Sequence, residues 1–140
     1  MKKIKIECNQ IRYAEFPELK FGISEDGDAY CDISHYLDEK ELSSTHDIFK
    51  FQQKFFYFLT KAQLAYQLDP ETIISENSED GHYLLISELA LLFIMYTDPN
   101  FMFYALDRID EMFTSGITMS DTALIQLSAN RVGILANTGS

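Results

Sequence analysis

The chain has 140 residues, 46% of them apolar and 14% aromatic, which is enough to bury a hydrophobic core as one domain. Its 22 acidic and 11 basic residues give a net charge of −11. This charge disfavours non-specific nucleic-acid binding, which depends on Lys and Arg contacts with phosphates. The longest apolar run, Leu89 to Tyr96, is far shorter than the roughly 20 residues that a transmembrane helix needs, so we expect no membrane partner.

The N-terminal third of the chain predicts β-structure. Residues 1–12 alternate apolar and charged side chains, which is typical of a strand. Residues 19–23 predict a second strand, and residues 28–33 predict a third. The Asp-Gly pair within Ser24–Gly27 indicates a hairpin turn between these two strands. The carboxylates around this turn lack the spacing of a calcium loop, so we expect no metal ion there.

Two helices are predicted next. Ile33–Leu42 reads as a short helix that begins at Ser34. Ile48–Leu68 is the longest helix, with Thr45 or Asp47 as its N-cap. Its predicted buried side consists of apolar residues at helical spacing: Ile48, Phe51, Phe55, Phe58, Leu59, Ala62, Ala65 and Tyr66.

A second hairpin follows the long helix. Glu71–Ile74 predicts a strand, Ser75–Gly81 a polar loop with an acidic tip, and residues 82–86 the returning strand. Beyond it, Ser87 is the predicted N-cap of a helix from Leu89 to Tyr96. Every residue of that helix is apolar, which indicates burial on most sides.

The last part of the chain is predicted to be helical. Pro99 separates the apolar helix from a second one over residues 100–114, which carries one apolar stripe and is expected to bury it. Met119–Val132 predicts a weaker helix, and Asn137–Ser140 a disordered tail. We therefore expect a single α+β domain over residues 1–118, with a C-terminal helix and tail over 119–140.

Motifs for catalysis are absent from the sequence. The three histidines are isolated, and no GxSxG, phosphate-binding or dinucleotide-binding loop is present. Cys31 and His35, with Asp32 nearby, are candidates for a nucleophile pair, but a structural role for Cys31 is favoured. Two cysteines without CxxC spacing fit a reducing, cytoplasmic setting. We expect no catalytic residue, no cofactor and no metal site.

Residues between positions 19 and 116 resemble a known family. The resemblance is carried by Tyr83–Leu85, Leu89–Phe93, Asp98–Phe101 and Arg108–Phe113, and more loosely by Asp28–Ile33. These stretches are similar to the KilA-N domain of phage and large DNA-virus proteins. The resemblance implies an α+β fold in which small β-hairpins pack against a helical core, as a winged-helix-like module. It also implies a phage regulator, such as an antirepressor, whose helix Ile48–Leu68 and second hairpin face DNA.

Two functional hypotheses remain open. The first is a sequence-specific DNA-binding transcriptional regulator, with base and phosphate contacts from Lys50, Gln52, Gln53, Lys54 and Lys61. In this hypothesis the basic patch is extended by Lys2, Lys3, Lys5 and Arg12. Its weakness is the acidic tip of the second hairpin, where the family typically has a basic surface.

The second hypothesis is a non-enzymatic interaction protein of phage or prophage type. Its acidic surface would bind and inhibit or regulate a host or phage protein with a basic surface, as a DNA mimic or anti-defence factor. The expected partner-binding residues are carboxylates in two clusters: Glu76, Glu79, Asp80, Asp107, Asp110 and Glu111. The net charge favours this hypothesis over DNA binding. We expect any homo-oligomer to form through the C-terminal helix.

Overall fold

A computed structural model describes residues 1–115 of the chain. The chain divides into two units, Met1–Thr97 and Asp98–Ser140, which are described separately. The first unit is an α+β fold, and this confirms the predicted fold class. The predicted helix at Met119–Val132 and the predicted tail at Asn137–Ser140 lie outside the described residues, and the single domain over residues 1–118 stays a prediction.

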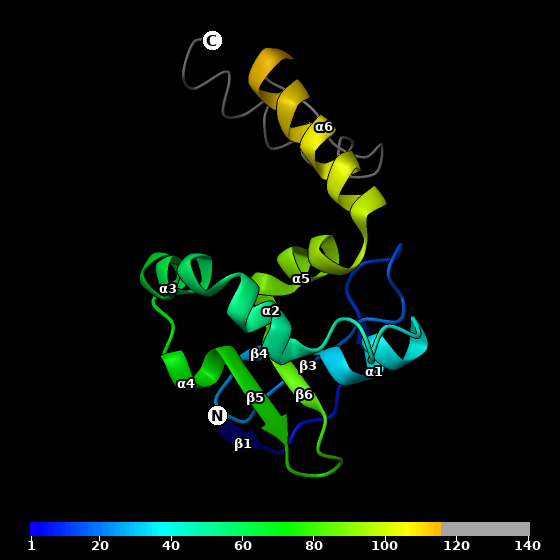
Figure 1. The fold of residues 1–140 in the computed structure, drawn as a ribbon. Helices are drawn as coiled ribbons and strands as arrows, with labels where there is room; N and C mark the ends of the chain where they lie inside the picture. Colours follow the sequence, from blue (N-terminus) through cyan, green and yellow to red (C-terminus); the bar gives the residue numbers. More distant parts are fainter. Residues whose placement is uncertain (116–140) are drawn as a thin grey trace, which may run out of the picture. The chain divides into compact units, whose positions relative to one another are not determined.

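One mixed sheet of six strands organises the first unit (Figure 1). The strands are β1 (Lys2–Ile4), β2 (Gln10–Ile11), β3 (Lys20–Ile23), β4 (Ala29–Asp32), β5 (Ile74–Asn77) and β6 (Tyr83–Ile86). Their order is β1-β5-β6-β4-β3-β2, with β1 parallel to β5 and every other pair antiparallel. The two predicted hairpins, β3–β4 and β5–β6, are thus neighbours in one sheet, joined where Tyr30 lies opposite Ile86.

The N-terminal segment differs from the single predicted strand. Residues 5–9 separate β1 from β2 and cross β3, where the backbone of Glu7 lies against Gly22. A Cβ added to Gly22 would be 2.2 Å from the carbonyl oxygen of Glu7, so only glycine permits this approach. The predicted β3–β4 turn is confirmed: Gly27 has φ +88° and donates its N–H to the carbonyl of Ser24 at 3.0 Å.

The helices are α1 (Ile33–Glu39), α2 (Ile48–Lys54), α3 (Phe56–Ala65), α4 (Pro70–Ile73), the 3-10 turn η1 (Ser87–Leu89), α5 (Ala90–Thr97) and α6 (Pro99–Ser115). The predicted cap of α1 was wrong. Asp32 accepts the N–H of His35 at 2.9 Å, whereas the hydroxyl of Ser34 accepts the N–H of Tyr83 at 2.8 Å. Of the two predicted caps of α2, Thr45 and Asp47, the structure has Asp47, which accepts the N–H of Lys50 at 2.7 Å.

The long helix predicted over Ile48–Leu68 is broken. Phe55 has φ −106° and ψ +23°, which ends α2 and lets α3 begin at the next residue. The break changes the helical phase, so the predicted buried side holds at Leu59 and fails at Phe58, Ala65 and Tyr66, which are exposed.

Two further boundaries also differ from the sequence-based expectation. Residues 70–73 form α4 rather than a strand, because Pro70 occupies its first turn and Asp69 accepts the N–H of Glu71 at 3.0 Å. Consequently β5 begins at Ile74, and its last three residues, 75–77, lie in the stretch that was predicted to be a loop. Ser87 lies inside η1 and makes no capping hydrogen bond.

Aromatic side chains form the core between α2 and α5, which lie next to each other in Figure 1. The ring of Phe51 is 5.1 Å from that of Phe93 and 5.5 Å from that of Tyr96, centroid to centroid. Tyr36 of α1 joins them, with its hydroxyl 3.0 Å from that of Thr97. The predicted burial of the apolar helix holds for Phe93 and fails at Leu91, which is exposed.

The described part of the second unit is α6. Asp98 opens it by accepting the N–H of Phe101 at 3.1 Å. No residue from Asp98 to Thr114 is buried, so the predicted buried stripe is exposed at positions such as Leu106 and Ile109. Among residues 1–115, no single helix has the length and apolarity to cross a membrane, although η1 and α5 taken together with α6 would meet both criteria.

Candidate functional site

The acidic tip of the β5–β6 hairpin is closer to charge balance than the sequence suggests. Glu76 lies 3.6 Å from the ammonium of Lys3, and Glu79 lies 3.5 Å from that of Lys5. These ion pairs follow from the parallel register of β1 with β5, in which Lys3 is opposite Glu76. Asp80, the third predicted partner-binding residue here, contacts His82 instead.

The second predicted acidic cluster lies on α6, in the other unit. Asp107 and Asp110 are exposed, and Glu111 accepts a hydrogen bond of 2.7 Å from the guanidinium of Arg108. The six predicted partner-binding carboxylates are therefore divided between two units. The first unit, which carries the sheet, contains three of them.

The residues predicted to contact DNA share one stretch of helices. All of them are exposed on α2 and α3: Lys50, Gln52, Gln53, Lys54 and Lys61. No Asp or Glu occurs between Ile48 and Leu68, so this stretch is locally basic in an acidic chain. Exposed aromatic residues lie among the lysines: Phe49, Phe56, Tyr57, Phe58 and Tyr66.

The predicted N-terminal extension of that basic patch is engaged elsewhere. Lys2 forms an ion pair of 3.1 Å with Asp26, and Lys3 and Lys5 pair with the β5–β6 hairpin. The guanidinium of Arg12 lies 4.3 Å above the ring of Phe21. The structure thus directs these cations toward neighbours in their own sheet.

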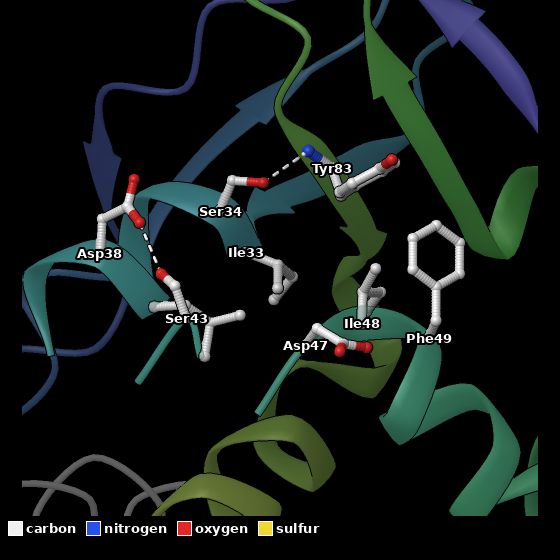
Figure 2. Close-up of a pocket in the computed structure, with 9 residues that line it drawn as sticks. Ile33, Ser34, Asp38, Ser43, Asp47, Ile48, Phe49 and Tyr83 are labelled. Carbon is white, nitrogen blue, oxygen red and sulfur yellow. Dashed lines mark hydrogen bonds between the residues drawn. The ribbon is translucent and has the colours of Figure 1, made fainter. Parts of the chain in front are cut away.

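A pocket of about 290 Å³ opens between α1, α2 and β6 (Figure 2). Its polar and aromatic lining consists of Ser34, Asp38, Ser43, Asp47, Phe49 and Tyr83. Apolar side chains, including Ile33, complete the wall. Figure 2 shows Asp38 and Ser43 on one side and Phe49 and Tyr83 on the other.

The pocket combines negative charge with an aromatic wall. One oxygen of Asp38 accepts from the hydroxyl of Ser43 at 2.5 Å, and one oxygen of Asp47 accepts from a backbone N–H at 2.7 Å. The second oxygen of each carboxylate has no hydrogen bond within residues 1–115. The rings of Phe49 and Tyr83 meet edge to face at 5.1 Å. Ammonium and guanidinium groups favour such surroundings.

Asp32 meets two residues from the β5–β6 hairpin, Asp80 and His82. The Nδ1 atom of His82 lies 2.9 Å from Oδ2 of Asp32 and 3.4 Å from Oδ2 of Asp80. Burial lowers the pKa of His82, but the hydrogen bond to Asp32 and the charges of Asp32, Asp80 and Asp38 outweigh it, so the net shift is upward. Sequence analysis missed this cluster because Asp32 and His82 are 50 positions apart.

The two thiols are poorly suited to nucleophilic chemistry. Burial, together with the charges of Asp32 and Asp80, raises the pKa of Cys8 to about 12. Burial likewise raises the pKa of Cys31, which is fully enclosed and donates to the carbonyl of Leu85 at 3.4 Å. Because the thiolate is the reactive form, both environments disfavour a cysteine nucleophile.

Comparison with protein-family models finds no match for this chain. Comparisons with curated proteins and with solved structures also find no match. The resemblance to the KilA-N family therefore stays a prediction, and the case for a function depends on the residues of the chain itself.

Proposed function

We propose that this chain is a non-enzymatic protein-binding module of phage or prophage type that binds and regulates a partner with a basic surface. The pocket of Asp38, Asp47, Phe49 and Tyr83 is the observation that carries the proposal. A net charge of −11 draws a basic partner toward it. Partners that normally bind nucleic acid present such a surface, so inhibition by DNA mimicry is the favoured mode.

An arginine or lysine side chain of the partner is the proposed occupant of the pocket. Its cation pairs with the free oxygens of Asp38 and Asp47, while its methylenes and charged head lie against the aromatic rings. Phe49 also begins the row of exposed aromatics on α2 and α3. A charged anchor surrounded by aromatic contacts is typical of the energetically dominant centre of an interface.

Affinity capture at low salt tests the proposal. The immobilised protein should retain a basic protein from host lysate, released as salt rises, and the double variant Asp38→Asn/Asp47→Asn should lose it. Asparagine keeps the helix cap and the acceptor for Ser43, so the fold is preserved. The control Glu25→Gln/Asp28→Asn removes the same charge from an exposed turn and should retain the partner.

A defined probe gives a second measurement. Titration with a short arginine peptide should shift the amide resonances of Ser34, Asp38, Phe49 and Tyr83 in wild-type protein and leave them unmoved in the Asp38→Asn/Asp47→Asn variant. Capture that is unchanged in this variant, or shifts that persist in it, would exclude the pocket as the binding site.

The second candidate function is DNA binding, favoured by the exposed lysines and amides of α2 and α3. The aromatics among them also suit stacking on unpaired bases. A mobility-shift assay with duplex and single-stranded DNA at low salt separates the two functions. DNA binding requires a complex that weakens as salt rises and is lost in Lys54→Gln/Lys61→Gln. If no complex forms at micromolar protein concentration, DNA binding is excluded and protein binding is the function that remains.

A further inference from the structure

We propose that Asp32, Asp80 and His82 form a binding site for one divalent transition-metal ion, best fitted by Zn²⁺. This inference goes beyond the proposed function and does not depend on it. The three side chains come from the end of β4, the β5–β6 turn and the residue before β6. Their ligand atoms all lie within 4.8 Å of one another.

The spacing of the donor atoms matches a shared ion. Nδ1 of His82 is 2.9 Å from Oδ2 of Asp32 and 3.4 Å from Oδ2 of Asp80. Two ligands bonded to zinc at about 2.1 Å lie about 3.0 Å apart at an octahedral edge and about 3.4 Å apart at a tetrahedral edge. Both distances from Nδ1 therefore fit a shared ion, and the carboxylate oxygens, which lie within 4.8 Å of each other, close on it when it binds.

Backbone amides hold both carboxylates in position. Oδ1 of Asp32 accepts the N–H of His35 at 2.9 Å, and Oδ1 of Asp80 accepts the N–H of His82 at 2.9 Å. In each carboxylate the other oxygen faces the imidazole, although Oδ1 of Asp32 is also 3.2 Å from Nδ1. Ligands oriented by such outer hydrogen bonds lose little freedom when an ion binds.

The chemistry of the donor set selects the class of ion. An imidazole with two carboxylates suits Zn²⁺ and neighbouring transition metals, whereas Ca²⁺ requires six to eight oxygen ligands. The side chains are 9%, 32% and 44% exposed at Asp32, His82 and Asp80, so the site opens to solvent on the Asp80 side. Water fills the remaining coordination positions. Without the ion, a hydrogen bond joins Nδ1 of His82 to Asp32.

Metal titration of the full chain tests the site. Chelator-treated protein should bind one Zn²⁺ by calorimetry and one Co²⁺ by visible absorption, and excess Ca²⁺ should not compete. His82→Ala should abolish binding. Asp80→Asn, which keeps the acceptor for the N–H of His82, should weaken it by at least about tenfold. Zn²⁺ should also raise the melting temperature of wild-type protein and not that of His82→Ala.

His35→Ala is the matched control. His35 lies 4.0 Å from Glu39 on α1 and is, within residues 1–115, the other histidine with a carboxylate neighbour, so its removal should leave Zn²⁺ affinity unchanged. The proposal is overturned if wild-type protein shows no saturable binding. It is equally overturned if His82→Ala binds as tightly as wild type, or if His35→Ala rather than His82→Ala removes the ion.

Discussion

The side-chain amide of Asn77 donates a hydrogen bond of 2.8 Å to the backbone carbonyl of Ile6, across 71 positions of sequence. Its oxygen accepts the N–H of Glu79 at 3.1 Å, and the whole residue is buried. One side chain thus fastens the N-terminal segment to the turn that carries Glu79 and Asp80. This attachment adds to the β1–β5 pairing in holding the lysines beside the acidic turn.

Replacing Asn77 should therefore lower the free energy of unfolding more than truncation of an exposed polar side chain does. Asn77→Ala leaves a buried carbonyl and a backbone N–H without their partner, which we expect to lower the free energy of unfolding by about 1–3 kcal/mol. Denaturant unfolding measures the change. Gln53→Ala, an exposed polar truncation on α2, should change stability by less than about 0.5 kcal/mol. Equal effects of the two variants would contradict the role of Asn77.

Gly22→Ala should be strongly destabilising. The added methyl would be 2.2 Å from the carbonyl oxygen of Glu7, so one of the two backbone segments must move. We expect a loss of about 3 kcal/mol or more, measured by thermal and denaturant unfolding. Gly27→Ala is the comparison, because its Cβ meets open space and only the positive φ opposes it, at a cost of about 1 kcal/mol. A smaller loss at Gly22 than at Gly27 would contradict the close approach.

Stability should fall in alkaline solution through Tyr30. Burial raises the pKa of this phenol above its usual value near 10, so the folded state keeps the proton where the unfolded state loses it. The stabilisation is complete below about pH 10 and is lost as pH rises, at no more than about 1.4 kcal/mol per pH unit. Tyr30→Phe should flatten this slope in unfolding titrations. An equal slope in wild-type protein and in Tyr30→Phe would contradict this role of Tyr30.

Phe51 of α2 and Phe58 of α3 differ in burial, so their alanine variants can be compared as a matched pair. Phe51 is fully enclosed against Phe93 and Tyr96, so Phe51→Ala should lower the free energy of unfolding by about 3–5 kcal/mol. Phe58 is exposed, and Phe58→Ala should change stability by about 0.5 kcal/mol or less. Chemical denaturation compares the two. A large loss at Phe58 would show that a second surface covers it.

Local sequence patterns predicted much of this fold. The Asp-Gly turn, the Asp47 cap and the proline at the start of α6 are each decided by a few neighbouring residues, and the structure has all three. The break at Phe55 depends on which side chains the core accepts, and periodicity alone does not show this. The helix at Pro70–Ile73 does have local signals, Pro70 and the Asp69 cap, which the strand prediction for this stretch overlooked. The exposed apolar stripe of α6 was also mispredicted as buried. The spacing of apolar residues along a helix shows that they share one face, but not which other element packs against that face.

The candidate sites were less predictable because both combine distant segments. Asp38, Asp47 and Tyr83 come together only when α1, α2 and β6 are assembled. His82 was isolated in sequence and meets Asp32 through the β4–β6 pairing. The lysines near residue 5 were expected to widen a basic surface, yet the parallel pairing of β1 places them against acids.

The pairing of β1 with β5 also bears on how the chain is made. Lys2–Ile4 leaves the ribosome long before its partner Ser75–Asn77. At about 5–20 residues per second, the delay is roughly 4–15 seconds. During that interval the nascent strand has an unpaired backbone edge. Two of its three residues are lysines, a composition that discourages edge-to-edge aggregation of the nascent strand. One of them, Lys3, later pairs with Glu76 of β5, so the same cation acts both during synthesis and in the folded sheet.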